Sequence, residues 1–418
     1  MTTTPDDRDE IRVSRRAALL GAAVVTAAAV VPSGRVLAQS PHRRIIAYVG
    51  TYTDRGKGIH IFGVDRETGK LTPIREVAEV DSPSALALDP TGHYLYAANE
   101  VGTFGNQATG SVTAYAIDRS NGNLRKLNAV SSGGPDPAHL SVDPSGRFVL
   151  VANYANVPPT QLPGASVAVL PITSGGSLSP ATDVVALPRG PLGPHRGTGS
   201  PPGSFADSGH DAPHAHMAVT DPAGRFVLVT DLGTDRIYIY RLDRMAGKLL
   251  PNDPPFFQAA PGVGPRHLAF HPWGRFCYSV NEESSTIDFL SYDPERGRLE
   301  LVQTLSTLPR GYEGTNYPSE IAVSEDGRFV HVANRLHDSI ATFALRHDGM
   351  MTHVGDAWTR GSYPRNFATD PTHRFTYVLH SRSDNITIFR NDRGRGGFDF
   401  TEQYVGVGNP SQIVFLEL

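Results

Sequence analysis

The feature that most constrains the fold is a strand–turn–strand motif that recurs six times along the chain. Each copy is a short apolar segment, a turn of the form Asp-Pro-x-Gly-Arg or close to it, and a second apolar segment that ends in a polar pair. Proline sets φ and glycine accepts positive φ, so the turn is tight. The copies span residues 84–100, 138–154, 216–232, 266–282, 319–335 and 365–381. Such self-similarity indicates a repeat architecture, because each unit must stack on neighbours to bury its apolar face.

Each copy continues into two further apolar segments, as at residues 111–118 and 124–130, and so predicts a four-stranded antiparallel blade. The chain ends complete a seventh blade. Residues 409–416 match only the first strand of the motif, and residues 45–50, 58–65 and 71–77 match the other three. We therefore predict an all-β, seven-bladed β-propeller over residues 44–418, closed by the C-terminal strand joining three N-terminal strands. Closure removes exposed sheet edges, whereas a solenoid would need atypical capping repeats, which the sequence lacks.

The first 38 residues are typical of a twin-arginine export signal. Ser14, Arg15 and Arg16 precede an apolar run at 17–31, and small or apolar residues at 36–38 provide a cleavage site. The alternative is an uncleaved anchor, but 15 apolar residues are short for a bilayer that requires about 20. We therefore expect export to the periplasm or the medium, with no membrane span after cleavage.

Charge and cysteine content exclude several classes of partner and site. A formal net charge of −4 argues against nucleic acid or an anionic membrane as a partner. The single cysteine, Cys277, excludes an intramolecular disulfide and a cysteine-based metal site. We expect a monomer that acts on a small molecule.

The propeller prediction places a ring of positions on one face of the central channel. The first strand of each blade lines the channel, and its start lies on the same face as the end of the second strand. Polar side chains at and next to these positions make up the candidate site: His139, His216, Arg266, His267, Glu282, Glu320, Arg335 and Arg365. Arginines offer planar donor forks for a carboxylate, a phosphate or an oxyanion, and His with Glu is a common proton-transfer pair. The alternative is that these charges pair with one another and fill a wet channel.

A long connection, residues 188–213, interrupts the repeat before His216. It is rich in Gly, Pro and Ser, and it should lie on the ring's face, where it could act as a lid. His210, His214 and His216 raise the alternative of a metal site. Their spacing is loose and no carboxylate-rich loop is nearby, so we expect no metal and no other cofactor. The chain also lacks a Gly-x-Ser-x-Gly elbow, which argues against a serine hydrolase.

A resemblance to a known family extends from about residue 44 to the end and is carried by residues 48–53 with 58–59, 213–216, 264–272, 281–282 and 333–340. These segments resemble the propeller lactonase family, which includes bacterial 6-phosphogluconolactonases and, more distantly, 3-carboxy-cis,cis-muconate lactonizing enzyme. The Gly-Pro-Arg-His segment at 264–267 and the Asn-Arg pair at 334–335 are its most specific parts.

The resemblance implies opening of a lactone ring by water, or the related cycloisomerisation. Its catalytic His, Arg, Glu and Arg fall on His216, Arg266, Glu282 and Arg335, positions that the ring already singles out. On this reading His216 and Glu282 move protons, and the arginines hold an acidic group and the oxyanion. The substrate-binding candidates are His139, His214, His267, Glu320 and Arg365.

The expected location of this chain does not fit the phosphorylated substrate of the family that it resembles. A phosphorylated gluconolactone belongs to the cytoplasm, whereas this chain carries an export signal. We therefore expect a sugar-acid lactone or another small carboxylated lactone. The alternatives are a muconate-type cycloisomerase and a propeller that binds a partner without catalysis.

Overall fold

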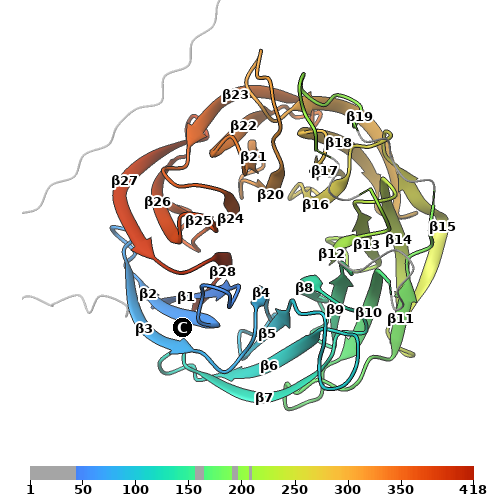
Figure 1. Cartoon of the computed structure of the whole chain (residues 1–418), viewed down its shortest axis with the longest axis vertical. Coiled ribbons are helices and arrows are strands. Elements are labelled where there is room, and N and C mark those ends of the chain that lie inside the picture. Colours follow the sequence, from blue (N-terminus) through green and yellow to red (C-terminus); the bar gives the residue numbers. More distant parts are fainter. Residues whose placement is uncertain (1–43, 156–163, 191–195, 207–209) are drawn as a thin grey trace, which may run out of the picture. The chain divides into compact units, whose positions relative to one another are not determined.

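A computed structural model describes residues 44–155, 164–190, 196–206 and 210–418 of the chain. These residues form 28 strands in seven four-stranded antiparallel sheets, arranged as blades around a central channel (Figure 1). The prediction of an all-β, seven-bladed propeller is confirmed. No helix long and apolar enough to cross a membrane occurs in the part of the chain that the structure describes. The proposed export signal, residues 1–38, lies outside the described residues.

We number the blades in chain order and give the strands of each from the channel outward. Blades 1 to 3 consist of β4 (Pro83–Leu88), β5 (Tyr94–Asn99), β6 (Ser111–Ile117) and β7 (Leu124–Ser131); β8 (Pro137–Val142), β9 (Phe148–Asn153), β10 (Ser166–Pro171) and β11 (Asp183–Ala186); and β12 (Ala215–Thr220), β13 (Phe226–Asp231), β14 (Arg236–Asp243) and β15 (Lys248–Gln258). Blades 4 to 6 consist of β16 (Pro265–Phe270), β17 (Phe276–Asn281), β18 (Thr286–Asp293) and β19 (Arg298–Ser306); β20 (Pro318–Val323), β21 (Phe329–Asn334), β22 (Ser339–Leu345) and β23 (Met351–Trp358); and β24 (Pro364–Thr369), β25 (Phe375–His380), β26 (Asn385–Asp392) and β27 (Gly397–Gly406).

Blade 7 joins the two ends of the chain. Its order is β28 (Pro410–Glu417), β1 (Ile45–Thr51), β2 (Ile59–Val64) and β3 (Leu71–Val77). Strand β28 pairs antiparallel with β1, from Ile45 opposite Glu417 to Val49 opposite Ile413. The C-terminal strand therefore closes the ring onto three N-terminal strands, as predicted.

The core lies between neighbouring blades. One cluster, for example, joins Val49 of β1 and Ile413 of β28 to Leu379 of β25. Second strands such as β9 and β13 are buried along their whole length, because each sheet packs against a neighbour on both faces. The outermost strands are largely exposed, as in β3. This pattern explains why the second segment of each repeat is so uniformly apolar.

The recurring turn of the repeat is stabilised by an aspartate side chain that accepts hydrogen bonds from the backbone of the turn. In blade 3, Asp221 Oδ1 accepts hydrogen bonds from the backbone N–H groups of Arg225, at 2.6 Å, and Phe226, at 2.9 Å. The corresponding Asp89, Asp143 and Asp370 accept from the same two positions of their turns. This local bonding makes a tight turn out of the Asp-Pro-x-Gly pattern.

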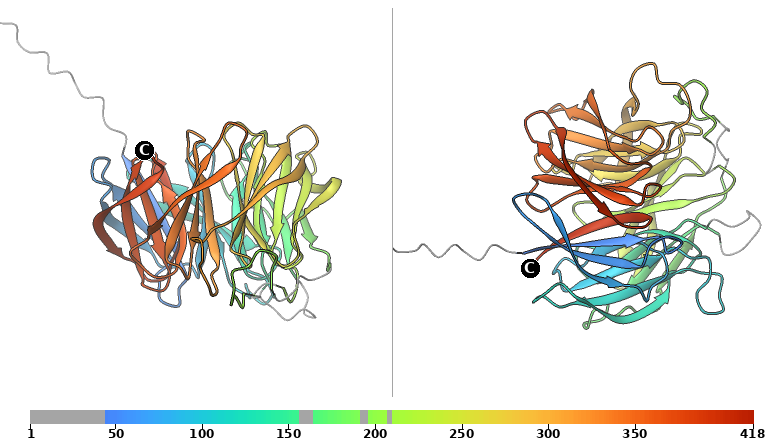
Figure 2. Two further views of the ribbon diagram at one scale, coloured as in Figure 1. Left: turned by 90° about the horizontal axis from the view of Figure 1, so that it is seen from above. Right: turned by 60° about the vertical axis from the view of Figure 1, so that its left-hand side comes forward.

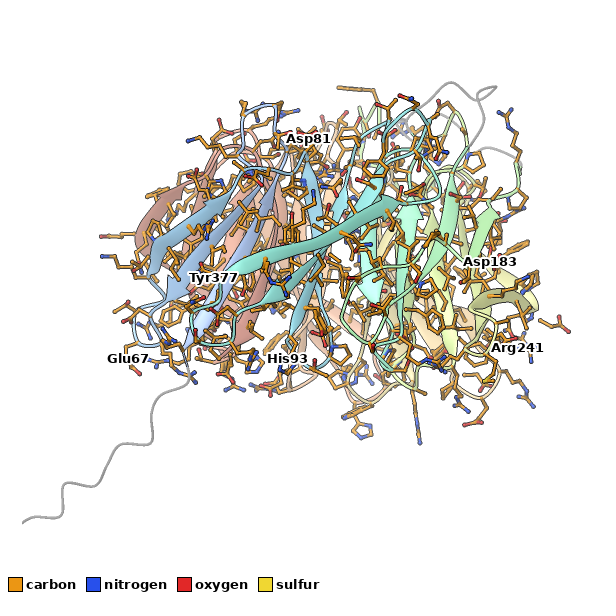
Figure 3. The ribbon with its side chains drawn as sticks, turned by 90° about the horizontal axis from the view of Figure 1, so that it is seen from below. Glu67, Asp81, His93, Asp183, Arg241 and Tyr377 are labelled. Carbon is orange, nitrogen blue, oxygen red and sulfur yellow. The ribbon has the colours of Figure 1, made fainter. Side chains whose placement is uncertain are left out.

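The turns that join the first strand of each blade to the second lie on one face of the propeller, and the innermost strands begin on the opposite face. Figure 3 shows His93, in the turn after β4, and Glu67, in the turn after β2, on the face opposite Asp81, which precedes β4. We call the face with the starts of the innermost strands the ring face, and the opposite one the turn face. Figure 2 shows the blades from the side, with their strands running between the two faces.

A β-bulge recurs at the start of every innermost strand. In β16, Pro265 pairs with Asn281 and His267 with Val280, so that Arg266 is an extra residue without a partner position. The same one-residue shift in register occurs at the start of each of the other six innermost strands. Because a bulge redirects the side chains around it, this irregularity falls on the residues that the ring argument selected, including His216 and Arg365.

Candidate functional site

A buried cluster of three charged residues links blades 4 and 5. Arg266 lies on β16, Glu282 directly follows β17, and Arg335 directly follows β21. Glu282 Oε2 is 2.6 Å from Arg266 Nε, and its Oε1 is 2.7 Å from Arg335 Nη2. Arg266 also donates to the backbone carbonyl of Ser319, and Arg335 Nε to that of Tyr317 at 2.8 Å. Both guanidinium groups are therefore held in place by partners from the protein.

Burial and neighbouring charge set the protonation of this cluster. Burial lowers the pKa of Arg266 to about 10, so that it remains a cation at neutral pH. Burial alone would raise the pKa of the Glu282 carboxyl, but the charges of Arg335 and Arg266 outweigh it, and the net shift is downward. Glu282 is therefore a carboxylate that does not readily accept a proton.

Gly264 fixes the backbone beneath the cluster. Its φ is +67°, and a Cβ there would lie 2.8 Å from the side chain of Glu283. The backbone N–H of Glu282 donates to the Gly264 carbonyl at 2.8 Å, which ties the end of β17 to the start of β16. A residue other than glycine would be strained by both the φ value and the contact. The Gly-Pro-Arg-His segment thus positions Arg266 and Glu282 together.

Tyrosine rings flank two of the arginines. The Arg335 guanidinium lies 5.5 Å from the ring centroid of Tyr317 and 5.3 Å from that of Tyr363. Tyr363 has φ of +66°, which is costly for an aromatic residue, and its N–H donates to Asp338 Oδ1 at 2.7 Å. The sequence analysis missed both tyrosines, although each directly precedes the proline that opens an innermost strand. This Tyr-Pro pattern is the signal that could have found them.

Arg365 belongs to a second polar group, contributed by three blades. It lies on β24, with its guanidinium 4.9 Å from the ring centroid of Tyr52, which follows β1, and it donates to the Tyr52 hydroxyl. That hydroxyl lies 2.6 Å from Glu100 Oε2, after β5. Arg365 is thereby held by partners from blades 7 and 1. Tyr52 is another residue that the sequence analysis did not select.

Three histidine side chains from the neighbouring blades 2, 3 and 4 form a layer in the channel. The ring centroid of His267 lies 5.0 Å from that of His216 and 5.6 Å from that of His139. Burial, followed by the charges of Arg266 and other neighbours, holds the pKa of His216 well below 6.5. Burial also lowers the pKa of His267, and it lowers that of His139 to about 3. All three rings are therefore neutral at neutral pH.

Glu320 orients one of these histidines. Its Oε1 lies 3.1 Å from His267 Nδ1 and accepts from the backbone N–H of Ile321 at 3.0 Å. Its Oε2 accepts from the Asn366 side-chain amide. Burial alone would raise the pKa of this carboxyl, but its interactions with His267, with the backbone N–H of Ile321 and with Arg266 together outweigh that effect, and the net shift is downward. Glu320 is therefore ionised beside the imidazole.

The remaining histidines of the sequence analysis stand apart from this layer. His214 stacks on Tyr154 at 4.2 Å, with Nδ1 2.9 Å from the Tyr154 carbonyl and Nε2 2.8 Å from Asp211 Oδ1. His210 lies 3.4 Å from Asp235. His214 thus supports Tyr154, whose ring contacts His216 edge-on at 5.7 Å. No group of three or more His, Cys, Asp or Glu side chains that could hold a metal ion occurs among the described residues.

Two cavities meet in the channel. A small one, of about 20 Å³, is lined by His216, Arg266 and Arg365 among others. A larger one, of about 460 Å³, runs between blades 5 and 6 past Phe329 and Phe398 to residues of the turn face such as Asp326. Five residues line both cavities: His139, His267, Glu320, Asn366 and Gln412. Glu282 and Arg335 are not among the described residues that line either cavity; Glu282 contacts the lining residue Arg266, and Arg335 contacts Glu282.

The described part of the long connection lies over the ring face. Thr198 N–H donates to the Pro261 carbonyl at 3.0 Å, before β16. Phe205 N–H donates to Thr315 Oγ1 at 2.9 Å, before β20. These bonds place residues 196–206 beside the entries to the strands that carry Arg266 and Glu320. Residues 191–195 and 207–209 of the connection lie outside the described residues.

Comparison with known proteins assigns the family. The family model described as "Lactonase, 7-bladed beta-propeller" matches residues 46–415. The chain belongs to this lactonase family. Within the family it is 34% identical to the 6-phosphogluconolactonase of Bacillus subtilis over 376 residues, which cover 89% of this chain and 99% of that protein. It is 28% identical to the 6-phosphogluconolactonase of Formosa agariphila, covering 88% and 98%. Among solved structures, the periplasmic gluconolactonase of Pseudomonas aeruginosa is 32% identical, with a TM-score of 0.79, covering 89% of this lactonase-family chain and 99% of that one.

Proposed function

We propose that this lactonase-family protein hydrolyses a small lactone at the level of the channel where the two cavities meet. The observation that carries the proposal is a buried arginine, Arg266, beside two neutral imidazoles, His216 and His267, in one cavity. A cation that is already held in place stabilises the oxyanion that forms when water attacks a lactone carbonyl. A neutral imidazole is the usual acceptor of the proton that this water releases.

The geometry revises the role that the resemblance suggested for Glu282. A carboxylate fixed between two arginines at 2.6 and 2.7 Å is a poor base. We assign it to holding Arg266, with Arg335 as its second partner. His216 and His267 are the two neutral histidines beside Arg266, and one of them takes the proton.

The substrate that fits best is a lactone bearing an acidic or strongly polar group. Arg365 lines the small cavity beside Arg266 and supplies donors for such a group, so that Arg266 is left for the oxyanion. The larger cavity, of about 460 Å³, has room for the rest of a sugar-sized molecule. The N-terminal segment supports a place outside the cytoplasm, and the solved relative from P. aeruginosa is named a periplasmic gluconolactonase. We therefore propose an unphosphorylated sugar-acid lactone, hydrolysed by a monomer without a metal.

The test is a pH-indicator assay of the purified chain, without its first 38 residues, against a panel of lactones that includes glucono-1,5-lactone. We expect acid release above the buffer rate, unchanged by EDTA. Arg266→Gln should lower kcat/KM by about 10²–10³-fold, the usual loss when one oxyanion donor is removed. Arg225→Gln, at an exposed ion pair with Glu295, is the matched control. No turnover across the panel, or equal activity of the two variants, would contradict the proposal, and loss of activity in EDTA would contradict the metal-free mechanism.

A further inference from the structure

We propose that His267, oriented by Glu320, is the residue that accepts the proton of the attacking water. The inference rests on the proposed function and names a catalytic pair within it. It differs from the assignment that the resemblance implies, in which His216 and Glu282 move protons. Three observations of the channel carry it.

The first observation is the contact that fixes the tautomer of His267. A carboxylate can only accept a hydrogen bond, so the 3.1 Å contact with Glu320 Oε1 places the imidazole proton on Nδ1. Glu320 cannot turn away easily, because Ile321 N–H and the Asn366 amide hold its two oxygens. His267 Nε2 is therefore the basic nitrogen. The same arrangement of carboxylate and imidazole orients the base in Ser-His-Asp enzymes.

The second observation is that this basic nitrogen has no hydrogen-bond partner among the residues that the structure describes. His267 is 7% exposed, and its Nε2 is buried without a hydrogen bond among the described residues. Buried polar atoms nearly always have a partner, so an isolated one indicates a position that a water or ligand occupies. His267 lines both cavities, and the small one has the volume of about one water molecule.

The third observation is the difference in charge around the two candidate bases. A histidine that accepts a proton becomes an imidazolium. At His216 this cation would face Arg266, Arg365 and Arg335, whose charges all oppose it. At His267 the Glu320 carboxylate supports it, against opposing charge from Arg266 and Arg365. The imidazolium is therefore more stable on His267 than on His216.

The step balances as a hydrolysis. The water oxygen bonds to the lactone carbonyl carbon while His267 Nε2 takes one of its protons, and the carbonyl oxygen becomes an oxyanion beside Arg266. The oxyanion then re-forms the carbonyl, the bond from that carbon to the ring oxygen breaks, and the ring oxygen takes the proton back from Nε2. The product is the open hydroxy acid, which ionises in solution.

The experiment replaces Glu320 by Gln. Its amide oxygen must stay at the Oε1 position to accept from Ile321 N–H, so the shape and the tautomer are kept while the negative charge that stabilises the imidazolium is lost. We expect kcat to fall by about 10²–10⁴-fold with little change in KM, as when the orienting carboxylate of a catalytic triad is replaced by an amide. His267→Gln should lose a similar factor, and adding Glu320→Gln to it should cause no further loss, because the two residues act as a unit.

Asp356→Asn is the matched control. It removes the carboxylate from another His–carboxylate contact, 3.2 Å from His353 Nε2, on the outer strand β23. We expect its kcat to equal that of the unsubstituted protein. Thermal unfolding of each variant separates a loss of fold from a loss of chemistry.

A second readout needs no substrate. Imidazole ¹⁵N NMR, with the His267 signals assigned by their absence in His267→Gln, should show a proton on Nδ1 and none on Nε2. A proton on Nε2 of the unsubstituted protein would overturn the pair even if Glu320→Gln does not fold. A folded Glu320→Gln variant with full kcat, or losses that multiply in the double variant, would overturn it too. If no lactone is hydrolysed, the proposed function fails, and with it the catalytic assignment; the NMR result then decides only whether Glu320 fixes the tautomer.

Discussion

Replacing Glu282 by Gln tests whether the buried charged cluster holds the site together. The substitution keeps the shape of the side chain but removes the charge that lies 2.6 Å from Arg266 and 2.7 Å from Arg335. The side chains of Arg266 and Arg335 are only 2% and 6% exposed, so solvent cannot replace the lost partner. Removing one member of a buried ion pair reduces stability by about 3–5 kcal/mol, because it leaves an uncompensated buried charge.

This loss converts to a measurable shift in melting temperature. At about 2.1 cal/mol/K per residue, the unfolding entropy of a domain the size of residues 44–418 is about 0.8 kcal/mol/K. A loss of about 3–5 kcal/mol then lowers the midpoint by about 4–6 °C at pH 7. Calorimetry or thermal circular dichroism of Glu282→Gln against the unsubstituted protein measures this difference.

The same substitution should show a defined pH dependence. The folded-state pKa of Glu282 lies below its usual value of 4.5, so its contribution to stability is present above about pH 4.5 and is lost as the pH falls through the lower folded pKa. The difference in thermal unfolding midpoint between Glu282→Gln and the unsubstituted protein should therefore become smaller in acid. Glu295→Gln, at the exposed pair with Arg225, is the control and should leave the midpoint within error. Equal midpoints for the two variants at pH 7 would refute the reasoning.

Two further predictions concern pH and closure. The rate of lactone hydrolysis should stay level down to about pH 6.5 and decline only below that pH, because burial lowers the pKa of His267 and the base must be neutral. The charged groups that face His267 are Arg266, Arg365 and Glu320, and the neutral ones are His139 and His216. In Glu320→Gln any residual activity should decline at a still lower pH, since the carboxylate raises that pKa, and a decline at higher pH would contradict this account. A chain that ends at residue 408 lacks β28 and exposes the edge of β1, so gel filtration should show aggregates in place of a compact monomer. A chain that ends at Glu417 keeps β28 and is the control; a soluble, cooperatively unfolding product from the shorter chain would show that closure by β28 is dispensable.

Much of the fold could be predicted from the sequence because its determinants are local and repeated. The turn works through bonds from Asp221 to residues only four and five positions later. The three N-terminal segments and the one C-terminal segment match different strands of the same motif, so the closing blade is visible without coordinates. The motif also places Arg266 and Arg365 at equivalent positions of different blades. Spacing alone therefore predicts that these two arginines occupy the same place in their blades.

The contacts that these side chains make with one another could not be predicted from spacing. Glu282 is held between arginines of two blades, Arg365 reaches Tyr52 and Glu100 from two other blades, and His267 finds Glu320 on the next one. Such contacts depend on the bulge at each strand start and on distances across the channel, neither of which a repeat of residue types encodes.

The sequence by itself determined the propeller, its closure and the face on which polar residues gather, because period, turn chemistry and apolar pattern act between near neighbours. Only the tertiary structure decided which of those residues are held in buried ion pairs and that His267 Nε2 has no hydrogen-bond partner among the described residues. The physical reason is that the protonation of Glu282 and of His267 is set by burial and by charges contributed from other blades, and these meet only when the ring closes.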